Sequence, residues 1–159
     1  MYRWIVYLHV ISVFIFLLQH GLEIVVTFKL RRQTDPAAVL PTLGLLDSPF
    51  DSPQSIRIMY AAIIITGLTA GFMTVWWRQG WMWTALGLMI IIGIFMNRAG
   101  TGYYTAVVGA ADNALKNKDD ASAMEKFNAA KNTMQPEILT VTGFFGGLII
   151  LWLMMFKPF

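Results

Sequence analysis

The stretch WIVYLHVISVFIFLLQHGLEIVVTF, from Trp4 to Phe28, decides the fold. At about 1.5 Å per residue, a helix of this length exceeds the roughly 30 Å hydrocarbon core of a bilayer. The stretch is too long and too rich in aromatic residues for a signal peptide. It runs directly into Lys29, Arg31 and Arg32, whose long basic side chains suit a membrane interface. We therefore predict a membrane-spanning helix here.

The composition of the whole chain also indicates a membrane protein. Of its 159 residues, 57% are hydrophobic and only 13% are charged, whereas a soluble domain carries about 25% charged residues. Cysteine is absent, which excludes disulfides, thiolate metal sites, iron–sulfur clusters and covalently attached c-type haem. The net charge of +3 comes without a basic patch interleaved with aromatic residues, so we expect no nucleic-acid partner.

Three further apolar stretches complete the prediction of an all-α, polytopic membrane protein. The predicted membrane helices cover about residues 4–28, 53–78, 81–98 and 138–156. A helical spacing of apolar residues continues through 99–135, with a turn in the middle, and predicts a helical hairpin outside the membrane. The expected fold is one domain over residues 1–159, a four-transmembrane-helix bundle with the hairpin protruding between helices three and four.

The connector between the first two helices contains helix-start and turn signals. Asp35-Pro36 is typical of a helix start, so we predict a short interfacial helix through Leu46. The sequence DSPFDSP, residues 47–53, then has turn chemistry. Near residue 80, a glycine within a tryptophan-rich stretch predicts a tight antiparallel turn between helices two and three.

Two pairs of glycines have the small-xxx-small spacing that lets helix backbones approach closely in lipid. Gly67 and Gly71 lie in the second predicted helix, and Gly143 and Gly147 lie in the fourth. We expect these glycines to mark helix-packing faces, including faces that join copies of the chain.

The distribution of basic residues predicts the orientation in the membrane. Three of the twelve, Arg3, Arg78 and Lys157, lie near the termini and in the turn after helix two. The other nine lie in the connectors 29–57 and 98–137. Because basic residues collect on the cytoplasmic side, we expect both connectors in the cytoplasm, both termini outside, and the cell membrane as the location.

A narrow polar stripe follows the first predicted helix. Its members fall within roughly 80° of each other at about 100° per residue, and they are His9, Ser12, His20, Glu23 and Thr27. His9 and His20 are candidate haem ligands, separated by roughly 16 Å along the helix. The chain has only these two histidines, so further ligands would come from a second copy, another subunit or methionine. The alternative is that both are hydrogen-bonded inside a polar helix interface.

The charged residues of the membrane helices predict a second feature. Glu23, Arg57 and Arg98 lie at similar depths, on the order of 10–14 Å from the bilayer centre. We expect Glu23 to pair with Arg57 or Arg98, in a buried polar network that includes Ser12 and His20; the alternative is that each charge extends separately to the interface. The other membrane helices lack acidic and histidine ligands, so we expect no metal site within one chain.

Four short sequences carry a resemblance to a known family. They are LHV at residues 8–10, LRR at 30–32, DP at 35–36 and WWR at 76–78, the last at the end of the glycine-containing second helix. Together they resemble a group of bacterial four-helix integral membrane proteins that are distantly similar to copper-resistance-D-like membrane proteins. The resemblance covers about residues 5–105. It implies histidine-containing helices, haem or copper handling and association with redox enzymes, and the family's histidine corresponds to His9.

Two functions from different classes follow as expectations. The first is a small membrane subunit with a structural or interaction role and no catalytic activity of its own. It would self-associate or join a larger membrane complex, of redox or energy-converting type. The alternative is a haem b-binding electron-transfer protein that uses His9 and His20 with ligands from a second copy or subunit. No catalytic motif is present in the sequence.

Overall fold

The structure, a computed structural model, describes residues 1–46, 52–118 and 120–159. These residues form helices and connections, with no strand among them. The helices in chain order are α1 (Tyr2–Arg31), η1 (Pro36–Ala38), α2 (Val39–Leu43), η2 (Gly44–Leu46), α3 (Pro53–Phe72), η3 (Trp76–Arg78), α4 (Gly80–Lys116), α5 (Ala121–Lys131) and α6 (Gln135–Phe156). The all-α class is therefore confirmed. The turn predicted at 47–53 lies mostly outside the described residues.

Four helices are long and apolar enough to cross a membrane. They are α1, α3, α4 and the run Ala121–Phe156, which ends with α6. The longest single helix is α4, whose 37 residues continue without a break from the predicted third membrane helix into the predicted hairpin. At 1.5 Å per residue α4 is about 55 Å long, which exceeds the thickness of a bilayer core.

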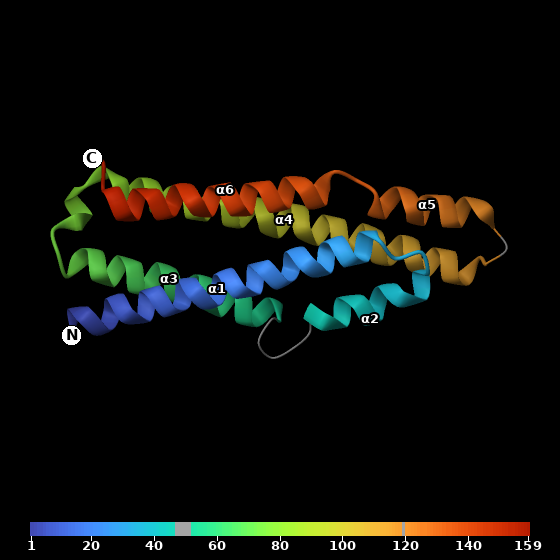
Figure 1. Ribbon diagram of the computed structural model, residues 1–159, viewed down its shortest axis with the longest axis horizontal. Coiled ribbons are helices and arrows are strands. Elements are labelled where there is room, and N and C mark those ends of the chain that lie inside the picture. The colour runs from blue at the N-terminus through green and yellow to red at the C-terminus, as the bar shows by residue number, and fades with distance from the viewer. Residues whose placement is uncertain (47–51, 119) are drawn as a thin grey trace.

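The membrane-length helices are arranged as two pairs (Figure 1). α1 packs along α3 and α4 packs along α6, and contacts between the two pairs are fewer. Successive helices run in alternating directions, so the two termini lie at one end of the molecule and the turn between α4 and α5 lies at the other. The tight turn after α3 does make α3 and α4 antiparallel, but the main partner of α3 is α1.

The second candidate membrane helix ends at Phe72, earlier than the sequence predicts, and Thr74 lies in the turn that follows. Its hydroxyl lies 3.2 Å from the carbonyl oxygen of Ala70 and 3.1 Å from that of Gly71. The same oxygen accepts from the backbone N–H of Trp76 at 3.3 Å. Thr66 and Thr69 also donate to carbonyl oxygens one turn earlier, inside α3, so such bonds do not end a helix. The bond that Thr74 accepts from Trp76 is the one that belongs to the turn into η3.

Buried apolar side chains collect at the two ends of the molecule. At the hairpin end, α1, α2, α4 and α5 share one cluster, which includes Leu30, Val39, Tyr103, Val107 and Phe127. At the end with the termini, a second cluster contains Trp81, Met82, Ala85 and Leu153. Only 17% to 22% of the residues in the most apolar windows of the four candidate spans are buried. Most of the surface of each span therefore faces outward.

Candidate functional site

His9 is held by α3. Its Nδ1 lies 3.1 Å from both the carbonyl oxygen of Ile63 and the hydroxyl of Thr66. A carbonyl oxygen only accepts hydrogen bonds, so this arrangement assigns the proton to Nδ1. The ring lies against Gly67, where an added Cβ would come within 3.0 Å of the imidazole Cε1. His9 thus fills the space beside a glycine of the neighbouring helix.

His20 has different neighbours, because α1 crosses from α3 toward α6. Its ring is stacked on Phe16 with an interplanar angle of 6°. Nδ1 lies 3.4 Å from a carboxylate oxygen of Glu23. Nε2 is buried and has no hydrogen-bond partner among the described residues. That nitrogen points at Gly143 of α6, and any Cβ at this position would collide with the ring.

The hydroxyl members of the stripe bond to backbone or to a neighbouring helix. Ser12 donates to the carbonyl oxygen of Leu8 at 2.8 Å, one turn earlier in its own helix. Thr27 donates to the carbonyl oxygen of Glu23 at 2.7 Å, and its hydroxyl lies 2.6 Å from the hydroxyl of Tyr104 on α4. Thr27 therefore joins α1 to α4, whereas Ser12 makes no link to His20.

Glu23 has a different ion-pair partner from the one that the sequence predicts. Its partner is His20, and neither Arg57 nor Arg98 forms a salt bridge with it in the described part of the chain. Both arginines are exposed. Equal depth in a membrane places charges at one level but leaves the rotation of each helix open, so equal depth alone does not bring an arginine to Glu23.

An ion pair that sequence reasoning missed joins α1 to α6. Arg31, in the last turn of α1, contacts Glu137, in the first turn of α6. The side chains are 30% and 38% exposed, so the pair is at the edge of the molecule. The available signal was that both residues lie at helix ends on the same side of the membrane.

Several glycines accept a long side chain from another helix in the space that a Cβ would fill. These contacts are His9 at Gly67, Met82 at Gly71, Tyr60 at Gly93 and His20 at Gly143. The last three connect the α1–α3 pair to the α4–α6 pair. Gly147 differs, because a Cβ there would meet nothing within 4 Å. Side chains, rather than closely approaching backbones, thus connect the two helix pairs.

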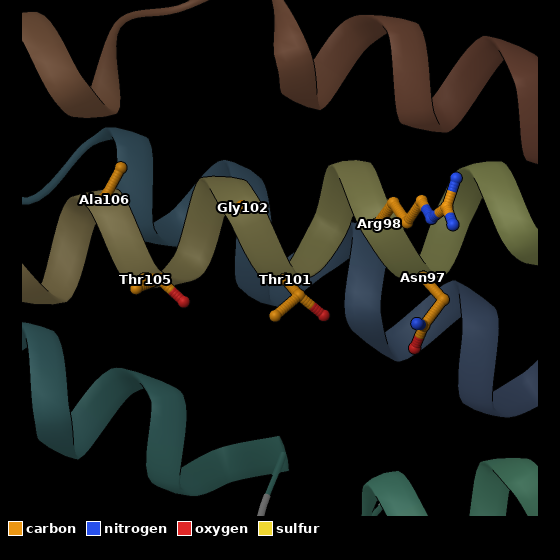
Figure 2. Close-up of a pocket in the computed structure, with 6 residues that line it drawn as sticks. All are labelled: Asn97, Arg98, Thr101, Gly102, Thr105 and Ala106. Carbon is orange, nitrogen blue, oxygen red and sulfur yellow. The ribbon is translucent and has the colours of Figure 1, made fainter.

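A groove lies on the outward face of α4, where the membrane span meets the hairpin (Figure 2). We call it the α4 groove; it is shallow and open, and it is lined by residues of α4 alone, namely Asn97, Arg98, Thr101, Gly102, Thr105 and Ala106. Of these residues the sequence singled out only Arg98. The rest could have been found from the polar and small residues that recur on one face of α4 across the predicted end of the third membrane helix.

The arrangement sets limits on the chemistry of the stripe. His9 faces α3 and His20 faces α6, so the two rings do not share one ligand-binding face. Within the described residues there is no group of three His, Cys, Asp or Glu side chains that could hold a metal ion. The polar stripe mainly contributes contacts between helices.

Comparisons of this chain with family models, with curated proteins and with solved structures found no match.

Proposed function

We propose that this chain is a small polytopic protein of the cytoplasmic membrane with an interaction role and no catalysis of its own. In this proposal the two helix pairs form a four-transmembrane-helix bundle, and the C-terminal half of α4 forms a hairpin with α5 that protrudes from the membrane. The observation that carries the proposal is the use of the polar stripe for contacts within the chain. His9 bonds to α3 and Thr27 bonds to Tyr104. Outside the stripe, Arg31 of α1 pairs with Glu137 of α6.

The outward-facing surfaces of the candidate spans suit protein partners that themselves lie in the membrane. Most residues of the candidate spans are not buried within the chain. On α6, apolar side chains such as Phe145, Leu148 and Trp152 are exposed, and Gly147 is open beside them. An open glycine among large apolar residues suits close approach by another helix. The partner is a second copy of the chain or a subunit of a larger membrane complex.

The proposed orientation follows from the basic residues. Arg31 and Arg32 lie at the end of α1, and Arg98 lies midway along α4, between its membrane-length segment and the hairpin. Both termini lie at the end of the molecule that is opposite the hairpin. The positive-inside rule then assigns the hairpin to the cytoplasm and the termini to the outside.

Self-association can be tested with two differently tagged copies expressed in the same membrane. We expect the second tag to be recovered with the first after solubilisation, and Gly147→Leu to reduce this recovery. Gly87→Leu is the matched control, because Gly87 also has nothing within 4 Å but lies on α4, outside the small-xxx-small pairs. A well-folded monomer that recovers neither the second tag nor another subunit would contradict the interaction role.

The alternative function, a haem b-binding electron-transfer protein, rests on one observation and on the resemblance to copper-resistance-D-like proteins. The buried Nε2 of His20 has no hydrogen-bond partner in the described part of the chain, and an imidazole nitrogen is the usual axial ligand of haem b. Access to this nitrogen requires α6 to move away, because Gly143 lies against it. A Soret band in purified protein that disappears in His20→Ala or His9→Ala would favour this function. A colourless preparation would exclude it.

A further inference from the structure

Two shallow, open surface regions adjoin on α4, share Arg98 and are lined by residues of this helix alone. The first is the α4 groove, whose polar side chains besides Arg98 are Asn97, Thr101 and Thr105. The second, which we call the apolar cavity although it is open, is lined by Ile91, Ile94, Phe95, Arg98 and Ala99. A polar compartment therefore lies beside an apolar one, where α4 passes from its membrane-length segment into the hairpin.

The direction of Arg98 places its charge between these compartments. Figure 2 shows its side chain running along α4, past Asn97 and away from Gly102. Helical side chains lean toward the helix N-terminus, which in α4 is the direction of the apolar segment. A guanidinium at this depth favours an anionic partner. Arg98 has no salt bridge within the described residues, and the candidate acid, Glu23, contacts His20.

The lining residues specify the chemistry of that partner. Arginine binds phosphate oxygens with two parallel hydrogen bonds. The hydroxyls of Thr101 and Thr105 and the amide of Asn97 supply further donors to the same polar compartment. The apolar cavity next to it offers only hydrocarbon surface at Ile91, Ile94 and the ring of Phe95. A ligand that fits both parts has an anionic phosphate and an attached apolar chain.

We propose that the outward face of α4 is a binding site for an anionic phospholipid. The phosphate lies against Arg98 beside Asn97, and one acyl chain follows the apolar cavity toward Ile91. Other basic residues in the same predicted connector region, Lys29 and Arg32, raise the local concentration of anionic lipids near the membrane surface. The site is independent of the interaction role proposed above, because it uses α4 rather than the open glycine of α6.

Native mass spectrometry of the full chain tests the site. The purified protein is mixed with equal amounts of phosphatidylglycerol and phosphatidylcholine, and the retained lipids are counted. We expect preferential retention of phosphatidylglycerol, and about a fivefold loss of its affinity in Arg98→Gln. Arg57→Gln is the matched control, since Arg57 is an exposed arginine at a similar predicted depth that does not line either cavity. Equal effects of the two substitutions would overturn the site and leave only a general charge effect.

Two further arms identify the source of the phosphate and keep the test independent of variant folding. Inorganic phosphate and glycerol phosphate at the lipid concentration should not displace phosphatidylglycerol, because they lack the chain for the apolar cavity. Displacement would assign the groove to a free phosphate and overturn the lipid proposal. A phosphatidylglycerol with a photoreactive acyl chain should crosslink the wild-type protein between residues 91 and 99. Crosslinks confined to other helices would also overturn the proposal.

Discussion

At the scale of single residues, the contact between His20 and Gly143 decides how closely α1 approaches α6. The ring is stacked on Phe16 and tethered to Glu23, so it cannot turn away freely. We expect Gly143→Ala to destabilise the protein by about 1–3 kcal/mol through overpacking. Thermal unfolding in detergent, followed by circular dichroism, measures the change.

Two variants serve as controls for this prediction. Gly147→Ala, where a Cβ meets nothing, should leave the stability unchanged or slightly raised, because alanine favours the helix. Gly143→Ala should cost much less stability in a protein that already carries His20→Ala than in the wild type, because the ring that obstructs the new Cβ is then absent. If Gly143→Ala and Gly147→Ala behave alike, the contact does not limit the packing.

The sequence could predict only part of this residue-scale detail. The positions of His9 and His20 on one stripe follow from the helical period, which depends on the sequence of α1 alone. The glycine that receives each ring depends on the rotation and crossing of two other helices, and no local signal specifies these. For the same reason the depth argument paired Glu23 with Arg57 or Arg98, which depends on other helices. The contact with His20, already in the predicted network, lies within α1 at a spacing of three residues.

At the scale of elements, the α4–α5 hairpin depends on Phe127. Its side chain is fully buried in the cluster with Tyr103 and Val107. We expect Phe127→Ala to cost about 3–5 kcal/mol and to increase amide hydrogen exchange throughout α5. Met124→Ala is the control on the same helix, because Met124 is 40% exposed, and it should change the exchange little. Equal protection in both variants would show that α5 does not depend on this cluster.

The start of α5 should respond to pH through Asp120. Its carboxylate accepts from the backbone N–H and the hydroxyl of Ser122, both at 2.9 Å, and these hydrogen bonds hold its pKa below the usual value of 3.8. Because the pKa of Asp120 is lower in the folded than in the unfolded protein, its ionised carboxylate stabilises the helix fully at pH values above the unfolded pKa. This stabilisation is lost as the pH falls through the folded pKa. We expect protection at the start of α5 to decrease as the pH falls below about 4.

The comparison with Asp120→Asn isolates this group from the other carboxylates. Asparagine can cap a helix but has no charge to lose, so the decrease should be smaller in this variant. Hydrogen exchange of residues 121–125 at several acidic pH values measures it. The same pH profile in both proteins would contradict a role for the Asp120 carboxylate.

Most elements were predictable, because long apolar runs determine them. The four membrane-length helices and the short helical connector after Asp35 were found from composition, periodicity and cap residues. Sequence reasoning also continued the helical pattern beyond Arg98, which the structure forms as one helix through Lys116. The end of α3 was misplaced, because the apolar residues continue past Phe72 through residues 75–77 and no proline marks the end.

At the scale of the whole molecule, the absence of cysteine makes the orientation directly measurable. A single cysteine introduced by Glu125→Cys on α5 should be protected from a membrane-impermeant thiol reagent in intact cells. One introduced by Trp77→Cys, in the turn at the other end, should react. Both should react after the membrane is permeabilised. The reverse pattern would invert the proposed topology while leaving the fold unchanged.

The pairing of α1 with α3 and of α4 with α6 has a consequence for biosynthesis. Each pair joins membrane-length helices that follow one another in the chain, and the first pair is complete once the chain has been made through Phe72. Helices inserted one after another can associate within the membrane as they become available. The α1–α3 pair can therefore assemble before α4 is synthesised, and α4 then awaits α6. Chains interrupted after the tryptophan-rich turn would already contain one finished half of the protein.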